Sequence, residues 1–220
     1  MKIQGTEFQY RRLSTPRSAA IAGILFGLLF SASLVLLRIA IPADPSAGFV
    51  WIEQGGWKIT LSLEMMPFAG IAFLWFIGVV RDRLGSFEDQ FFSTVFFGSG
   101  ILFLSMVFVS MAIAGGMVAG YHLNPGITFD SRLIYFGRML MIQLSNVYAL
   151  RMAGVFMLSL GTIWLRTGLM PRWLVILTYL LAASLLLIIN LSLWVTLIFP
   201  AWVVMISIEI LLLRLRQSTA

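Results

Sequence analysis

The chain is built from long apolar runs, of which residues 59–80, ITLSLEMMPFAGIAFLWFIGVV, are typical. A transmembrane helix needs about 20 consecutive, mostly apolar residues, and a run of this kind is long enough to cross a bilayer. The whole sequence is 60% hydrophobic and 11% charged, whereas a soluble domain carries about 25% charged residues. The sequence therefore predicts an integral membrane protein, and its net charge of +6 does not indicate a nucleic-acid-binding surface.

We predict an all-α fold, a polytopic membrane protein whose six helices form a transmembrane bundle. The six spans are expected at residues 19–41, 59–80, 92–116, 143–165, 173–190 and 193–213. The last two form one apolar stretch, which as a single helix would be about 60 Å long, twice the thickness of the hydrocarbon core. The segment INLSL at residues 189–193 is therefore predicted to be a tight turn between them.

Both termini are predicted to be cytoplasmic, because basic residues gather on the segments that this orientation places inside. Arg11 and Arg12 precede an apolar run that is too long for a signal peptide, so the first span is expected to stay uncleaved. Residues 1–17 would form a cytoplasmic tail, residues 18–214 the transmembrane domain and residues 215–220 a second cytoplasmic tail. The inner basic residues would be Lys2, Arg11, Arg12, Arg17, Arg81, Arg83, Arg166, Arg172, Arg214 and Arg216, and the outer ones Arg38, Lys58, Arg132 and Arg138.

Two residues of opposite charge fall inside the predicted spans. Glu64 lies about 7.5 Å into the second span from its outer end, and Arg151 lies at a similar depth in the fourth. A single charged side chain at mid-membrane costs about 2.5–3.5 kcal/mol on insertion scales. Because each charge would supply the partner that the other lacks, we predict that Glu64 and Arg151 form a buried ion pair.

Three further polar residues are expected to join this buried polar site. Gln143 and Asn146 lie one to two helical turns outward from Arg151, and Arg38 lies near the outer end of the first span. The group has two interpretations. It either fixes the register of the helices, or it is a ligand site that binds an ion or a polar molecule or relays a proton.

Small residues and prolines predict where the helices pack closely and where they bend. A stripe with a spacing of four runs along the first span, where it would let another helix approach closely. Pro67 and Pro200 are predicted kinks, and Pro67 also leaves the Leu63 carbonyl without its helical donor. The stripe consists of Ala19, Gly23, Gly27 and Ser31.

The sequence holds few residues of the kinds that carry catalysis or bind metals. It has no cysteine, which excludes thiolate zinc sites, iron–sulfur clusters and cysteine nucleophiles, and its one histidine is His122. No nucleotide-binding or metal-binding motif occurs, so we predict no catalytic residue, metal site or cofactor and do not expect an enzyme. The expected partners are membrane lipids, with a homo-oligomer or another membrane subunit as open alternatives, and no nucleic acid.

Two segments resemble parts of uncharacterised multi-pass bacterial membrane proteins. Residues 154–181, GVFMLSLGTIWLRTGLMPRWLVILTYLL, contain a helix end, a small polar turn and a Pro-Arg-Trp-Leu element that opens the next helix. Residues 73–100, FLWFIGVVRDRLGSFEDQFFSTVFFGSG, are similar to the same kind of protein. The resemblance implies about six spans and a location in the bacterial cytoplasmic (inner) membrane. It implies no activity and no site residue.

Three functions are compatible with these observations. The one that we favour is a structural or accessory membrane subunit, in which the buried Glu–Arg pair serves packing. The alternative is a small transporter or a membrane protein that binds a ligand or an ion at a polar site in the outer half of the bilayer. A membrane enzyme that acts on lipid is a minor alternative, because the sequence shows no nucleophile or metal set for it.

Overall fold

The computed structural model describes residues 16–41, 50–84, 90–123, 131–187 and 193–218, and all the secondary structure in these ranges is helical. The elements in chain order are α1 (Pro16–Ala40), α2 (Val50–Leu84), α3 (Gln90–Leu123), α4 (Ser131–Ile142), the π-helical segment η2 (Gln143–Ala149), α5 (Leu150–Thr167), α6 (Arg172–Leu187), the short 3-10 helix η3 (Leu193–Leu197) and α7 (Ile198–Ser218).

Within the described ranges, five helices are long and apolar enough to cross a membrane. They correspond to five of the expected spans. The sixth, α6, is apolar but shorter, and its 16 residues extend about 24 Å. This apolar helical bundle indicates a membrane-embedded protein, which agrees with the composition of the chain.

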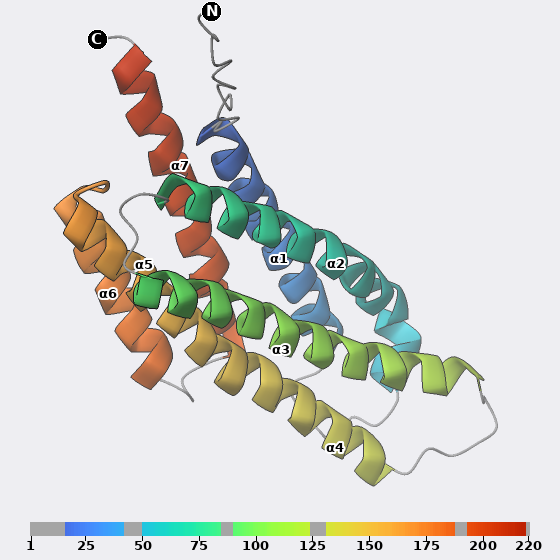
Figure 1. Cartoon of the computed structure of the whole chain (residues 1–220). Coiled ribbons are helices and arrows are strands. Elements are labelled where there is room, and N and C mark those ends of the chain that lie inside the picture. The colour runs from blue at the N-terminus through green and yellow to red at the C-terminus, as the bar shows by residue number, and fades with distance from the viewer. Residues whose placement is uncertain (1–15, 42–49, 85–89, 124–130, 188–192, 219–220) are drawn as a thin grey trace, which may run out of the picture.

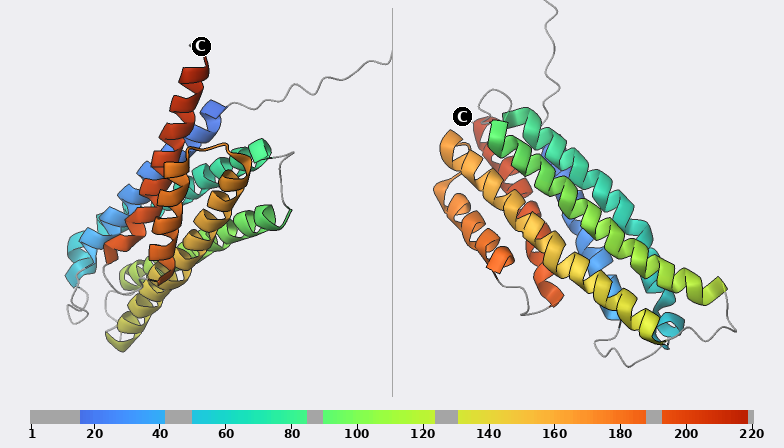
Figure 2. Two further views of the ribbon diagram at one scale, coloured as in Figure 1. Left: turned by 90° about the vertical axis from the view of Figure 1, so that its left-hand side faces the viewer. Right: turned by 60° about the horizontal axis from the view of Figure 1, so that its bottom comes forward.

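The helices form two layers that cross at an angle. α2, α3, the continuous rod of α4, η2 and α5, and then α6 lie side by side in one layer, and α1 and α7 pack behind them (Figures 1 and 2). The first turn of α1 and the last turns of α7 lie at the same end of the bundle (Figure 1). We call the opposite end, where α1 ends and α4 begins, the distal end.

The helices are longer than the predicted spans at the distal end. α3 continues to Leu123, and α4, η2 and α5 together form an apolar rod over Arg132–Thr167, where we expected a span at 143–165. Hydropathy detects the apolar window and not the helix ends, and the sequence from Ser131 to Ile142 contains no proline to stop a helix. α6 ends at Leu187 and η3 begins at Leu193, so the predicted turn at 189–193 falls largely outside the described residues.

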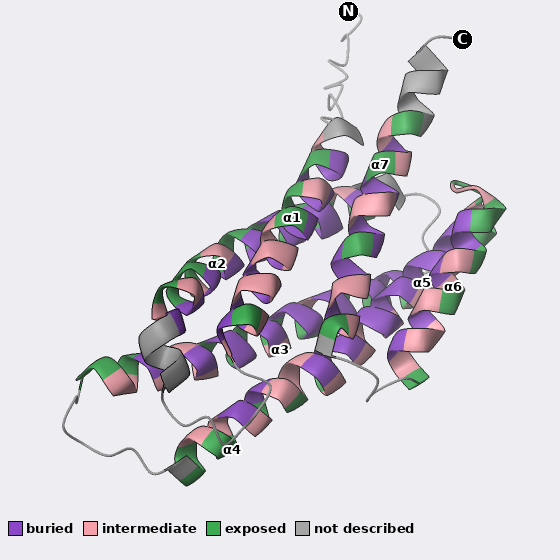
Figure 3. Ribbon diagram, turned by 180° about the vertical axis from the view of Figure 1, so that it is seen from behind, coloured by how far each residue is buried: buried purple, intermediate pink, exposed green. Residues whose placement is uncertain are grey.

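Aromatic rings form the centre of the bundle. Phe73 of α2 lies 4.6 Å from Phe26 of α1, 5.5 Å from Phe156 of α5 and 5.7 Å from Phe199 of α7, measured between ring centroids. All four rings are fully buried, and the buried positions of the helices turn towards the middle of the bundle (Figure 3). Lipid tails are as apolar as these side chains, so close packing between rings, more than escape from water, holds this core together.

Two further contacts fix α1 against its neighbours. Ser33 of α1 and Ser62 of α2 are fully buried, and each hydroxyl lies 2.8 Å from the main-chain carbonyl oxygen of the other residue. A Cβ atom added at Gly23 or Gly27 would overlap side chains of α7, so the predicted stripe of small residues faces α7 of the same chain.

The two prolines occupy different places. Pro67 lies inside α2, with helix on both sides. Pro200 is the third residue of α7 and lies in its first turn, where an amide has no partner within an α-helix. Pro200 therefore marks the start of α7, and the kink that we expected there is replaced by the junction between η3 and α7.

Candidate functional site

The predicted buried pair between Glu64 and Arg151 is the main correction. Glu64 is exposed on α2, and Arg151 is half-buried on α5. Within the part of the chain that the structure describes, neither residue forms an ion pair with the other. They lie on α2 and α5, two helices that each pack against α3.

The physical reason is the position of α3. It packs against both α2 and α5 and separates them along the layer (Figure 2). Similar depth in the membrane therefore did not bring Glu64 and Arg151 together, because depth does not say which helices are neighbours.

Arg38 and Asn146, two other members of the predicted group, do meet. The guanidinium Nη2 of Arg38, in the last turn of α1, donates a hydrogen bond of 2.7 Å to the side-chain oxygen Oδ1 of Asn146 in η2. An arginine has only donors, so the amide oxygen of Asn146 must face it. Asn146 is 8% exposed, and this bond therefore joins two helices in a largely dry environment.

Two serines extend this contact to α3. The hydroxyl of Ser145 lies 3.0 Å from Oδ1 of Asn146 and 2.9 Å from the carbonyl oxygen of Met141. It has one proton and can donate to only one of them at a time. The hydroxyl of Ser110 on α3 donates to the same Met141 carbonyl over 3.0 Å. The result is a connected polar network from α1 through η2 to α3.

A second arginine gives the site its charge. Arg138 of α4 is 7% exposed, although arginine is almost never buried without a compensating interaction. Its guanidinium lies near enough to Arg38 for the two positive charges to repel each other. Arg38 has no carboxylate partner among the described residues, and its Nε–H is buried without a hydrogen-bond acceptor. Arg38 therefore brings a positive charge without a carboxylate partner in the described part of the chain, and Arg138, which makes a further interaction of its own, lies within its electrostatic reach.

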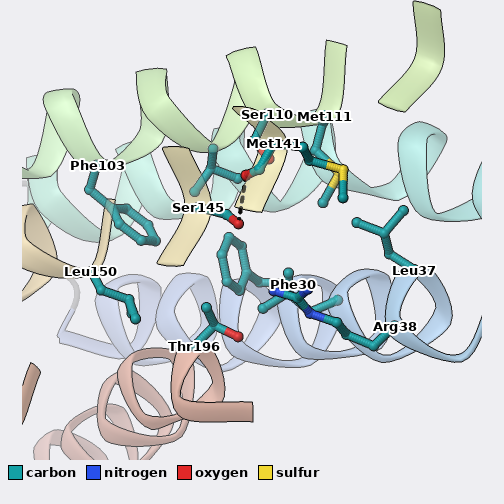
Figure 4. Close-up of a pocket in the computed structure, with 12 residues that line it drawn as sticks. Phe30, Leu37, Arg38, Phe103, Ser110, Met111, Met141, Ser145, Leu150 and Thr196 are labelled. Atoms are coloured by element: carbon teal, nitrogen blue, oxygen red, sulfur yellow. Dashed lines mark hydrogen bonds between the residues drawn. The ribbon is translucent and has the colours of Figure 1, made fainter. Parts of the chain in front are cut away.

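A small cavity adjoins these groups. It has a volume of about 20 Å³, enough for one water molecule. Arg38 reaches from α1 into the space between Ser145 of η2 and Thr196 of η3, with Phe30 and Phe103 among the apolar walls (Figure 4). We call Arg38, Arg138, Asn146, Ser145, Ser110 and Thr196, with this cavity, the cationic centre.

The backbone of η2 positions two of these groups. A π-helical turn closes hydrogen bonds five residues apart in place of four, and such segments are frequent at functional sites. η2 contains both Ser145 and Asn146, and Asn146 is one of its buried residues. An irregular backbone of this kind is tolerated at membrane depth where protein surrounds it.

Sequence reasoning found part of this centre. It named Arg38 and Asn146, and it also named Gln143, which is exposed at the start of η2. It placed Arg138 in an outer segment and did not select Ser145. The sequence did contain a signal for these residues. The spacing between Arg138, Met141 and Ser145 is three and then four residues, which places them on one face of a helix.

The centre offers hydrogen-bond donors and positive charge, and it has no acid–base pair for catalysis among the described residues. Guanidinium groups bind carboxylate and phosphate oxygens through two parallel hydrogen bonds, and hydroxyls add further donors. Among the described residues, no group of three or more His, Asp or Glu side chains could hold a metal ion. The centre therefore offers the kinds of donor and charge that oxyanion sites use.

Comparison of the chain with protein-family models, with curated proteins and with solved structures found no match. The resemblance to multi-pass bacterial proteins therefore stays a prediction, and so does the bacterial membrane that it implies.

Proposed function

We propose that this protein is a membrane protein that binds a small oxyanion, a carboxylate or a phosphate group, at the cationic centre. The observation that carries the proposal is the buried Nε–H of Arg38, which has no acceptor and lies in a guanidinium close to a second buried arginine. A buried donor without a partner costs about 1–3 kcal/mol, and more when it is charged. An anion at this place would remove that cost and screen the two positive charges from each other.

Binding requires the centre to open. Its cavity holds one water and is too small for a carboxylate or a phosphate group. Met111 and Met141 are among its walls, and methionine side chains adapt their shape with little strain. We expect the ligand to enter from the distal end, where α4 begins, because Arg38 lies only two residues before the last residue of α1.

The test is a ligand-dependent change in stability in nanodiscs of neutral phospholipid. Ligand binding raises the free energy of unfolding by about 2.7 kcal/mol at a ligand concentration of about 100 times Kd. We expect phosphate or acetate, but not chloride at equal ionic strength, to raise Tm in a saturable way. Arg38→Gln should abolish the effect, whereas Arg172→Gln, a change at an exposed arginine at the start of α6, should leave it intact.

Further measurements with anionic lipid and with additional variants identify the source of the anion. If stabilisation needs phosphatidylglycerol and no soluble oxyanion replaces it, the bound group is a lipid headgroup. If Arg38→Gln and Arg172→Gln respond alike, or if no oxyanion or anionic lipid stabilises the wild type, the proposal is wrong. Arg38→Lys keeps the charge but not the planar donor fork, and we expect it to weaken binding without removing it.

The remaining expectations on topology and location belong to the same proposal. We propose six crossings, with α6 as the shortest, cytoplasmic termini and a bacterial inner membrane. The shared end of α1 and α7 and the basic residues of the adjoining segments support this orientation. In it, the cationic centre lies in the outer half of the bilayer, and labelling of single cysteines from one side of sealed vesicles would test it.

A structural or accessory role is the second candidate. The specific observation in its favour is the exposed carboxylate of Glu64 in the apolar part of α2, which a partner subunit would cover. The two functions can coexist, because Glu64 does not line the cavity of the cationic centre.

A further inference from the structure

Glu64 occupies an unusual place for an acidic residue. It lies nine residues after Gly55 and four residues before Phe68, the middle of the apolar window Gly55–Arg81 of α2. At about 1.5 Å per residue, it is about 6 Å from the middle of that window. Acidic residues in transmembrane helices nearly always face the bundle interior or a wet cavity, yet Glu64 is exposed.

The surface around Glu64 is apolar. Phe68, Ile71 and Trp75 continue the same exposed side of α2, with 64%, 49% and 67% of their side chains accessible. Within the described residues, Glu64 makes no hydrogen bond or ion pair. A carboxylate on this surface would face hydrocarbon if the chain were alone in the bilayer.

A groove opens along the same stretch of α2, and residues close to Glu64 in the sequence line it. It runs between α2 and α3, has a volume of about 370 Å³, and opens outward. Its lining includes Leu63 and Pro67, which flank Glu64 in the sequence, and Gly115 of α3. Gly115 leaves the groove open, because the nearest side-chain atom to a Cβ placed there would be Leu63 Cδ1 at 3.4 Å.

We propose that the α2–α3 groove and Glu64 form a docking surface for a transmembrane helix of another protein that carries an arginine or a lysine. The apolar residues of that helix would fill the groove, and its cation would pair with Glu64 at the same depth. Charge complementarity supports this occupant, since each charge alone is costly in hydrocarbon and the pair removes both costs. Met111 lines both this groove and the cavity of the cationic centre, whereas Gly115 and Pro67 line only the groove.

A lipid headgroup fits this position less well. The hydrocarbon core is about 30 Å thick, so a residue about 6 Å from its middle lies about 9 Å inside its edge. An amine headgroup would have to sink to that depth to reach the carboxylate. A helix carries its cation at any chosen depth without moving a headgroup out of the interface.

The test uses a synthetic helix in vesicles of phosphatidylcholine. The probe is a leucine-rich transmembrane peptide of about 22 residues, with one arginine about four residues from its centre. The reference peptide has leucine at that position. The chain contains no cysteine, so Leu61→Cys provides a single labelling site one turn from Glu64, and energy transfer reports association.

We expect the arginine peptide to bind about tenfold more tightly than the leucine peptide. Glu64→Gln should remove this preference, whereas Glu209→Gln, a change at a half-buried acid of α7, should leave it unchanged. Gly115→Leu should fill the groove and weaken the binding of both peptides. Gly116→Leu is the matched control, because a Cβ there meets nothing within 4 Å, and it should leave both peptides bound.

Three results would overturn the proposal. The first is equal binding of the two peptides to the wild type. The second is self-association of the labelled chain without peptide that Glu64→Gln abolishes, which would make a second copy the occupant. The third is enrichment of labelled phosphatidylethanolamine around the wild type but not around Glu64→Gln, which would make a lipid the occupant. None of these results bears on anion binding at Arg38.

Discussion

The aromatic core and the cationic centre are both buried, but they are built in opposite ways. In the core, Phe26, Phe73, Phe156 and Phe199 contact one another with no polar atom to satisfy. In the cationic centre, the Nε–H of half-buried Arg38 has no hydrogen-bond acceptor, and the positive charge of Arg138 acts on the same guanidinium. The first arrangement serves close packing. The second leaves a buried polar group unsatisfied.

We expect this difference to separate residues that keep the fold from residues that would bind the proposed oxyanion. Substitutions in the core should change stability and leave the response to oxyanions intact. Substitutions in the cationic centre should do the reverse. The serine pair between α1 and α2 lies between these extremes, because its hydroxyls are polar and fully satisfied.

The largest effect is expected in the core. Phe73→Ala removes a ring that touches partners on α1, α5 and α7, and it should lower the free energy of unfolding by about 3 kcal/mol. The measurement is unfolding by dodecyl sulfate in mixed micelles. Phe68→Ala on the same helix is the control, since Phe68 is 64% exposed, and it should cost less than about 0.5 kcal/mol. Equal losses would mean that Phe73 is not a core contact.

Substitutions in the serine pair are expected to have a smaller effect on the free energy of unfolding. Hydrogen bonds between transmembrane helices contribute about 0.6 kcal/mol on average and at most about 1.7 kcal/mol. Ser33→Ala, Ser62→Ala and the double substitution form a cycle whose coupling energy should fall in that range, by the same unfolding measurement. A coupling energy of zero would show that the two hydroxyls do not act together across α1 and α2.

The smallest effect on stability is expected in the cationic centre. Arg38→Met keeps the length of the side chain, removes a charge that Arg138 repels, and leaves Ser145 as a donor to Asn146. Without oxyanions, the free energy of unfolding should not fall by more than about 1 kcal/mol, because the substitution also removes a buried donor that has no acceptor. In their presence, the stabilisation seen for the wild type should vanish.

A large loss would contradict this interpretation of Arg38. Breaking a buried ion pair costs about 3–5 kcal/mol, because the remaining charge has no partner. A loss of that size in Arg38→Met would show that Arg38 pairs with a carboxylate of the chain itself. The acids to substitute next would be Asp44, Glu53 and Asp130, whose side chains lie outside the described residues.

The sequence predicted the apolar helical bundle well. Runs such as residues 59–80 have the length and the apolar composition of a membrane-spanning helix, and α2 contains all of that run. Arg38 and Asn146 were placed in one polar group because both lie towards the outer ends of their spans. Their hydrogen bond of 2.7 Å is in keeping with that placement.

What the sequence could not give was the order of helices around the bundle. Glu64 and Arg151 share a depth, but α3 lies between their helices, and hydropathy contains no information on neighbours. The sequence also could not predict the π-helical segment η2. Whether a helix closes its hydrogen bonds four or five residues apart depends on packing with its neighbours. The sequence therefore named Asn146 but not the π-helical backbone that positions it beside Ser145.

The most direct test of anion binding at the cationic centre is an experimental structure determined with selenate, whose selenium scatters anomalously. We expect an anomalous peak beside Arg38, with selenate oxygens within hydrogen-bond distance, about 3 Å, of its Nε. The contradicting result is a cationic centre without selenate in which a carboxylate of the chain itself accepts a hydrogen bond from that Nε.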